Sequence, residues 1–268
     1  MKRHPNNHYI DTHCHFDFPP FVDDIAHSIA LLQRANVNKV IIPAVNADRF
    51  ELISQLCSQH APLYMALGLH PIYSHAHSDL ALLEHYLQSY SQQHHHSKCV
   101  AIGEIGLDGY IEQADFTQQL QLLRAQFELS NQFKLPVILH SRKSHALLLK
   151  EIKAAKLLHR GVIHGFSGSY EEAKQFIQQG FYIGVGGVIS YERANKTRQA
   201  ISKIPLDFIV LETDSPDMPL QGYQGQANRP EQILRIAEIL AQLRGVDVQN
   251  IAETCYANSL TLFSRMIE

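Results

Sequence analysis

Short apolar stretches recur along the chain and alternate with segments of helical spacing. Val, Ile, Leu and Ala dominate these stretches, and each is long enough to form a buried strand. The predicted strands cover residues 9–15, 39–45, 63–70, 99–108, 136–142, 161–166, 181–187 and 208–214. A closed barrel of alternating strands and helices needs eight parallel strands, so the pattern predicts an α/β protein with a TIM (βα)8 barrel.

Residues that cap helices stand between the predicted strands. Asp115 with Gln118 matches the capping-box pattern of a helix start. Ser169 with Glu172 matches it too, and Gly180 stands where this second helix should end. These signals support the alternation of strand and helix.

The last part of the chain predicts two more helices. Pro230 begins the first and Gly245 ends it, and the second covers residues 248–266. Residues 91–98 form the segment for which we expect the least order. The sequence contains no repeat and no linker-like stretch, so we expect a single domain over residues 1–268.

Composition limits the classes of partner. The 268 residues include 23 Lys and Arg and 26 Asp and Glu, and the resulting formal charge of −3 does not indicate an extended nucleic-acid or membrane surface. With 45% apolar residues the chain can bury one large core. Neither a signal peptide nor a membrane span is visible, so we expect a cytoplasmic monomer that contacts no membrane. Scattered cysteines predict reduced thiols; they are Cys14, Cys57, Cys99 and Cys255.

Six side chains of metal-binding type stand at the ends of predicted strands. Strand ends on one face of a parallel barrel are where this fold places its chemistry. Imidazole and carboxylate groups bind divalent metals, so the set predicts a metal centre and, with it, a hydrolase. The candidates are His13, His15, Glu104, His140, His164 and Asp214.

His13 and His15 are two residues apart on one strand, so their side chains point the same way and can bind a single ion. Cys14 then points to the opposite side. An HxH pair arises easily by chance among 17 histidines, but its place after an early strand favours a site. Asp11 can orient one of these histidines or cap a turn.

Glu104 lies within the apolar stretch VAIGEIGL, where burying a carboxylate is costly unless a cation compensates it. Two metal ions about 3.5 to 4 Å apart would provide that charge, with the carboxylate between them. The alternative is a buried ion pair with Arg or Lys. Asp108 can orient a ligand, line the pocket or be a plain loop residue.

His140 and His164 follow successive strands, where each can offer one imidazole to the second ion. A single histidine after a strand is more often a satisfied polar residue, but two at equivalent positions favour ligands. Arg142 and Ser167 are suited to contact an anion, although Arg142 could equally pair with a surface acid.

Asp214 can bind a metal and also accept a proton from the attacking water, as hydrolysis requires. Glu212 lies on the same face of its strand and can support a ligand or form an ion pair inside the barrel. Asp217 fits a turn.

Longer motifs occur in order along the chain. They are DTHCH, GLHP around His70, GEIGLD around Glu104, LPVILHSR, HGFSGS, LETDSP, NRPE at residues 228–231 and TxxxNxxxLF at residues 254–263. With these motifs the sequence resembles the TatD family of metal-dependent hydrolases in the amidohydrolase superfamily. Its C-terminal motifs are most similar to the YjjV-type subgroup, and the resemblance covers essentially the whole chain.

This resemblance implies a TIM barrel with a divalent-metal site and, for some relatives, cleavage of DNA from the 3′ end. The ligand sets that it implies are His13, His15 and Asp214 for one ion and His140 and His164 for the other, with Glu104 shared. It also implies that His70 contacts the substrate phosphate. The sequence departs from the family pattern where Gly109 replaces an aromatic residue, with Tyr110 next, so we expect a substrate pocket of different shape.

The expected function is hydrolysis of a phosphodiester, at a DNA 3′ end or in a small substrate, by a water that two divalent ions activate. Zn, Mn and Mg are the candidate metals. Asp214 and Glu104 are the candidate catalytic residues. The candidate substrate contacts are His70, Arg142 and Ser167.

The same centre could instead open an amide, lactone or aminoacyl ester, since metals polarise a carbonyl as readily as a phosphoryl oxygen. A metal-binding module without activity is the third hypothesis. The capacity to bind phosphate distinguishes the phosphodiesterase hypothesis from the carbonyl-hydrolase hypothesis. The candidate phosphate contacts at loop positions are Arg142, Ser167, Arg193 and Arg229.

Overall fold

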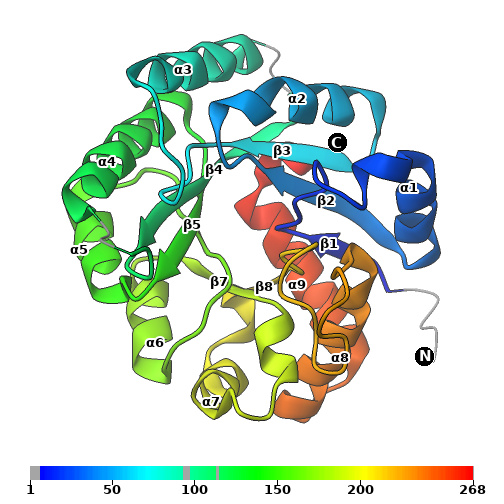
Figure 1. Cartoon of the computed structure of the whole chain (residues 1–268). Coiled ribbons are helices and arrows are strands. Elements are labelled where there is room, and N and C mark those ends of the chain that lie inside the picture. The colour runs from blue at the N-terminus through cyan, green and yellow to red at the C-terminus, as the bar shows by residue number, and fades with distance from the viewer. Residues whose placement is uncertain (1–6, 93–96, 113–114, 268) are drawn as a thin grey trace.

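The computed structural model describes residues 7–92, 97–112 and 115–267, which form a barrel of parallel strands surrounded by helices (Figure 1). Each strand is hydrogen-bonded to the next in chain order, which confirms the predicted TIM barrel. The strands are β1 (Tyr9–Asp11), β2 (Val37–Pro43), β3 (Leu63–Leu67), β4 (Cys99–Asp108), β5 (Val137–Arg142), β6 (Gly161–Ile163), β7 (Tyr182–Val185) and β8 (Ile209–Leu211). Residues 93–96, within the segment expected to be least ordered, lie outside the described residues.

The barrel closes between β1 and β8 through residues that follow both strands. The Thr12 amide donates to the Leu211 carbonyl at 3.1 Å, and further along the Asp214 amide donates to the His13 carbonyl at 2.8 Å. The sequence predicts longer strands here than the structure contains. The regular strands end sooner, but their pairing continues as far as the metal-binding candidates.

Helices follow the strands and pack around the outside of the barrel (Figure 1). They are α1 (Ile25–Arg34), α2 (Phe50–Gln59), α3 (His77–Ser91), α4 (Phe116–Phe133), α5 (His145–Ala155), α6 (Tyr170–Gln178), α7 (Asn195–Lys203), α8 (Ile233–Arg244) and α9 (Val248–Leu262). Pro230 begins a 3-10 turn that leads into α8, and Gly245 ends this helix in a left-handed conformation with a φ of 66°. Within the described ranges, no helix is both long and apolar enough to cross a membrane.

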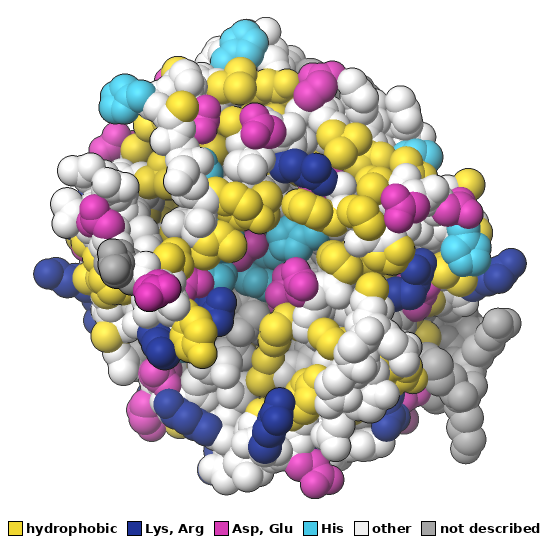
Figure 2. Space-filling model, viewed as in Figure 1, with side chains coloured by type: hydrophobic (Ala, Val, Ile, Leu, Met, Phe, Trp, Pro, Cys, Tyr) yellow, Lys and Arg dark blue, Asp and Glu magenta, His cyan; other side chains and the backbone are white. Residues whose placement is uncertain are grey.

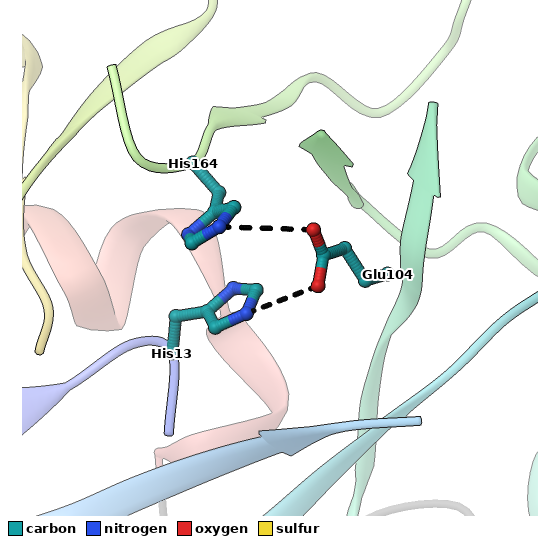
Figure 3. Close-up of side chains that lie close together, drawn as sticks. All are labelled: His13, Glu104 and His164. Atoms are coloured by element: carbon teal, nitrogen blue, oxygen red, sulfur yellow. Dashed lines mark ion pairs between the residues drawn. The ribbon is translucent and has the colours of Figure 1, made fainter. Parts of the chain in front are cut away.

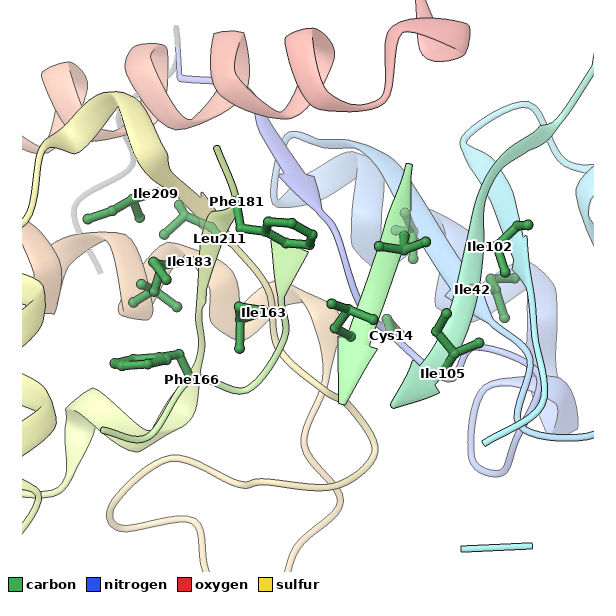
Figure 4. Close-up of a cluster of buried hydrophobic side chains, with 14 of the residues drawn as sticks. Cys14, Ile42, Ile102, Ile105, Ile163, Phe166, Phe181, Ile183, Ile209 and Leu211 are labelled. Atoms are coloured by element: carbon green, nitrogen blue, oxygen red, sulfur yellow. The ribbon is translucent and has the colours of Figure 1, made fainter. Parts of the chain in front are cut away.

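Side chains alternate along the strands between two hydrophobic clusters. Val40 and Ile42 belong to an outer cluster between strands and helices, part of which Figure 4 shows. Ile41, between them, belongs to an inner cluster inside the barrel. This alternation fills both the barrel and the layer around it.

The segment after α9 closes the amino-terminal end of the barrel. Phe263 and Met266 are buried in the inner cluster, and Arg265 donates to the carbonyl of Cys99, the first residue of β4, at 3.2 Å. The predicted last helix is therefore too long, because the chain leaves helical geometry at Phe263 to place these side chains under the strands. The opposite end of the barrel remains available for chemistry.

The predicted capping residues form the starts of two helices. At α4 the Asp115 side chain accepts hydrogen bonds from amides of the first turn, including that of Gln118 at 3.2 Å. At α6 the full box is present, because Ser169 and Glu172 each accept a hydrogen bond from the other's amide. The Glu172 carboxylate also pairs with Lys196 Nζ at 3.0 Å.

Glu172→Gln should destabilise the protein more at neutral pH than in acid. Burial alone would raise the pKa of this carboxyl, but hydrogen bonds from Ser169, Lys196 and His145 outweigh it and lower the pKa to about 2. The stabilising charge is therefore present above the ordinary pKa of 4.5 and is lost as the pH falls toward 2. After allowance for partial exposure, we expect a loss of about 1 kcal/mol in the free energy of unfolding at pH 7.

Urea denaturation at several pH values measures this difference, which should shrink in acid. Glu171→Gln, on the same turn but exposed, is the matched control and should change stability little. A loss for Glu172→Gln that does not vary with pH would contradict the ionic role.

Candidate metal centre

The six predicted metal-binding side chains converge at the carboxyl ends of the strands. Figure 3 shows His13, after β1, and His164, after β6, both pointing at the Glu104 carboxylate on β4. The rings of the two histidines stack with their centres 3.5 Å apart. Cys14 lies on the other side, in the outer hydrophobic cluster, as predicted (Figure 4). All four cysteines are free and buried.

An irregularity in β4 turns Glu104 toward the inside of the barrel. Ile102 pairs with Val137 and Ile105 pairs with Leu139, so β4 fits one extra residue into this stretch. As a result Ile102 and Ile105 both pack in the outer cluster, which strict alternation forbids for residues three apart. Glu104 lies between them, is only 3% exposed, and directs its carboxylate inward.

Gly106 allows β4 and β5 to pair beside the site. It lies opposite His140 in the strand register, with a φ of 150°, and a Cβ at this position would overlap the His140 carbonyl. The absence of a side chain therefore lets the backbone of β4 come close enough to set His140 next to Glu104.

The two oxygens of the Glu104 carboxylate face different groups of imidazoles. Oε2 lies 3.2 Å from His13 Nε2 and 3.8 Å from His15 Nε2. Oε1 lies 3.0 Å from His140 Nδ1 and 3.7 Å from His164 Nε2. The close partners of this buried acid are thus histidines, instead of the Arg or Lys that the alternative hypothesis required.

Asp214 joins the group on the Oε2 side. Its Oδ1 lies 3.6 Å from His13 Nε2 and 3.7 Å from His15 Nε2, and those two nitrogens are 3.4 Å apart. Its φ of 56° is left-handed, a conformation that is uncommon for aspartate and often found at functional sites. Three sets each place their ligand atoms within 4.8 Å of one another: His13, His15 and Asp214; His13, Glu104 and His164; His70, Glu104 and His140. Nitrogen and carboxylate donors gathered in this way fit a divalent cation.

His70 lies in direct contact with the site. Its Nε2 is 3.1 Å from Glu104 Oε1, the oxygen that also faces His140, and the residue is 4% exposed. The resemblance implied a contact with the substrate, and the structure adds this contact with the central carboxylate.

Two acids lie behind candidate ligands and contact their imidazoles. Asp108 Oδ2 lies 2.8 Å from His140 Nε2, which leaves Nδ1 to face Glu104. Glu212 Oε1 lies 3.2 Å from His164 Nδ1, which leaves Nε2 to face the centre. Both acids had several possible roles from sequence alone, and the structure favours that of a supporting partner.

Asp11 supports the backbone instead of an imidazole. Its Oδ1 accepts hydrogen bonds from the His13 amide at 3.2 Å and the Thr213 amide at 2.9 Å. This buried carboxyl group therefore joins the segments that carry candidate ligands after β1 and after β8.

Burial and neighbouring charges set the proton distribution among the site residues. Burial lowers the pKa of His13 well below its usual value, so its imidazole is neutral and can bind a cation. Burial raises the pKa of Glu104, but nearby histidines outweigh it and hold the pKa well below normal. Burial opposes a charged His164, yet Glu212, Asp214 and Glu104 raise its pKa to about 10. A metal ion would take the place of that proton and satisfy the same acids.

The site opens into a cavity of about 890 Å³. Figure 2 shows the hollow near the middle of this face, with histidine and acidic side chains in it and hydrophobic side chains around it. Arg142 and Ser167 line the cavity. Arg193 lies over a tyrosine ring and Arg229 pairs with Glu231, and neither is among the described residues that line it.

Most of the apolar rim of this cavity leaves no clear signal in the sequence. Its members are Phe18, Val45, Ile72, Tyr73, Tyr110, Val188 and Met218. Four of them are exposed by 39 to 60%, which is unusual for such side chains: Ile72, Tyr73, Tyr110 and Met218. They come from several loops, so no spacing links them. The one available signal is an apolar residue shortly after a strand-end motif, as in GLHPIY and GLDGY.

Comparison with known proteins decides the family. A family model described as TatD related DNase matches residues 10–264. The chain belongs to the TatD family. It is 47% identical over 256 residues to the metal-dependent hydrolase YjjV of Escherichia coli K12, with 96% of this chain and 98% of YjjV covered. The crystal structure of E. coli YjjV matches with a TM-score of 0.92 at 46% identity, covering 96% of this chain and 98% of that one.

A human relative, named deoxyribonuclease TATDN3, is 30% identical over 276 residues, with 96% of this chain and 95% of the relative covered. The resemblance to the TatD family and to YjjV is thus confirmed. The protein is a metal-dependent hydrolase of the TatD family.

Asp108→Asn should lower the pKa of His140 in protein stripped of metal. Burial disfavours the charged imidazole, but hydrogen bonds with Asp108 and Glu104 outweigh it and raise the pKa above its ordinary value. With one carboxylate removed, the imidazole should lose its proton at lower pH. NMR titration of the ring protons measures this shift, and His140→Gln identifies the signal. His145, which pairs with Glu172, is the internal control. An unchanged midpoint for His140 would rule out the orienting role of Asp108.

Proposed function

We propose that this protein hydrolyses a phosphodiester, at the 3′ end of DNA or in a small substrate, with two divalent ions and an activated water. The observation that carries the proposal is the position of Glu104, with Oε2 toward His13 and Oε1 toward His140. A carboxylate between two groups of imidazoles suits a ligand that two ions share. The family match and the name of the human relative support a nucleic-acid substrate.

The proposal gives each side chain a role. The ligands are His13, His15 and Asp214 for one ion, His140 and His164 for the other, and Glu104 for both. Bound Zn, Mn or Mg would supply a nucleophilic water near neutral pH and neutralise charge on the phosphoryl oxygens. Asp108 and Glu212 would hold two of the imidazoles in the orientation that ligation requires.

Asp214 is the proposed proton acceptor. Its side chain is 20% exposed and lines the cavity, whereas that of Glu104 is 3% exposed, so water from the cavity reaches Asp214 more easily. Burial raises its pKa to about 6. In the metal-free site the carboxylate is then largely ionised at neutral pH, the state in which it can accept a proton.

The proposed substrate contacts are His70, Arg142 and Ser167, all of which line the cavity. Arginine and hydroxyl groups suit a phosphate, and His70 lines the cavity with its Nε2 3.1 Å from Glu104 Oε1. With a net charge of −3, the chain suits a strand end or a short substrate better than a long duplex.

Elemental analysis should find up to two divalent ions per chain, and Glu104→Gln should weaken the binding of both. In the proposal one carboxylate binds both ions, so its replacement removes a negatively charged ligand from each of them. Equilibrium dialysis against Zn, Mn and Mg measures the affinities. Glu238→Gln, which alters a surface pair with Arg235, is the matched control and should keep full metal content. Loss of only one ion from Glu104→Gln would show that the carboxylate is not shared.

Asp214→Asn should reduce turnover by roughly two or more orders of magnitude, because the proton acceptor is removed while its shape is kept. Metal content should fall less. The assay uses metal-loaded protein with phosphodiesters, lactones and aminoacyl esters. Asp247→Asn, at the capped start of α9, is the matched control and should keep full activity. Near-normal turnover by Asp214→Asn would refute its role as base, and turnover of lactones or esters alone would identify a carbonyl hydrolase.

A further inference from the structure

Tyr110 gathers two cations at the mouth of the cavity. The Arg142 guanidinium lies 4.5 Å from the centre of its ring, and the Lys143 ammonium lies 4.2 Å from it. All three side chains line the cavity, and Tyr110 is 60% exposed. The negative face of an aromatic ring attracts cations, so it lets two like charges remain close together. We call these three residues the cation clamp.

The backbone at Gly109 holds together the two loops that carry the residues of the clamp. Its amide donates to the Arg142 carbonyl at 2.7 Å, which ties the loop after β4 to the loop after β5. A Cβ on Gly109 would lie 3.1 Å from the Lys143 carbonyl oxygen and 3.1 Å from the Phe116 ring, so a larger residue would require these neighbours to shift by a few tenths of an ångström. The glycine that departs from the family pattern thus suits the close approach of the two loops that carry Tyr110 and the cations.

The conformation of Lys143 also contributes to the clamp. Its φ of 51° is left-handed, which is uncommon for lysine and costs free energy that the surrounding structure must offset. Among the residues that the structure describes, no carboxylate is paired with Lys143. Its charge is therefore available to a ligand in the cavity.

Two side chains separate the clamp from the centre of the site. Arg142 Nη1 lies 3.7 Å from Asp108 Oδ2, and Asp108 contacts His140 at 2.8 Å. His140 in turn contacts Glu104 at 3.0 Å. An anion held by the clamp is thus a different group from the one that reacts beside Glu104. Because Asp108 is already engaged by His140, it neutralises the clamp only in part.

We propose that the cation clamp binds a second phosphate of the substrate, next along the strand from the phosphate that is hydrolysed. A guanidinium and an ammonium together present several donors and two charges, which suit a phosphate better than a neutral group. This inference rests on the proposed function and narrows it. The preferred substrate is a short single strand with at least two phosphates.

The test compares three dinucleotides: dithymidine monophosphate alone, with a 5′-phosphate, and with a 3′-phosphate. For metal-loaded protein we expect kcat/KM to be about tenfold higher for at least one of the two terminally phosphorylated dinucleotides. In Lys143→Gln and Tyr110→Leu, the ratio of kcat/KM for that phosphorylated dinucleotide to kcat/KM for the unphosphorylated one should fall toward one. Tyr110→Phe keeps the ring and should keep the preference. Arg193→Gln removes a cation 5.0 Å from the Tyr191 ring, outside the cavity, and should leave the preference unchanged.

Equilibrium binding of the same dinucleotides by calorimetry gives a readout that does not depend on turnover. If none is hydrolysed but a terminal phosphate strengthens binding, and Lys143→Gln abolishes this gain, the clamp is upheld and the proposed function fails. If all three are hydrolysed with equal kcat/KM by the unaltered protein, the clamp is refuted and the proposed function stands. Equal binding of all three would also refute the clamp, as would loss of the preference in Tyr110→Phe.

Discussion

The Glu104 carboxylate is buried and needs compensating charge or hydrogen bonds, which the rest of the site provides. An acid in the mouth of an apolar barrel costs several kcal/mol unless charge or hydrogen bonds compensate it. Histidines from several strands supply that compensation on both of its oxygens. The extra residue in β4 makes the arrangement compatible with the core, because Ile102 and Ile105 keep their outward packing while the acid between them turns inward.

The pairing at the seam between the segments of β1 and β8 both closes the barrel and positions part of the site. His13 and Asp214 are far apart in sequence, yet their backbones are hydrogen-bonded at 2.8 Å. Asp11 strengthens the seam from below, since it accepts from the amide and the hydroxyl of Thr213 as well as from the amide of His13. Backbone pairing therefore helps to set the positions of two candidate ligands.

Sequence alone predicted the barrel and the converging side chains because both leave a local signal, an apolar run that ends in a polar residue. Other features have no such signal. The irregularity of β4 is hidden in a continuous apolar stretch, and the end of α9 depends on where Phe263 packs. From the sequence, Asp11 and Asp108 could each orient a ligand, yet Asp11 accepts from backbone amides whereas Asp108 also reaches an imidazole. Which atoms such acids reach depends on loop geometry, which a single sequence does not contain.

The closed amino-terminal end of the barrel can form only late in synthesis. Cys99 begins β4, but Arg265, which holds the floor of the barrel against it, is translated 166 residues later. Until Phe263 and Met266 emerge, the inner faces of the earlier strands have no cover at that end. Contacts so distant in sequence form slowly, and uncovered strands expose apolar surface. A nascent chain of this protein therefore exposes apolar surface at that end of the barrel until the segment after α9 has left the ribosome.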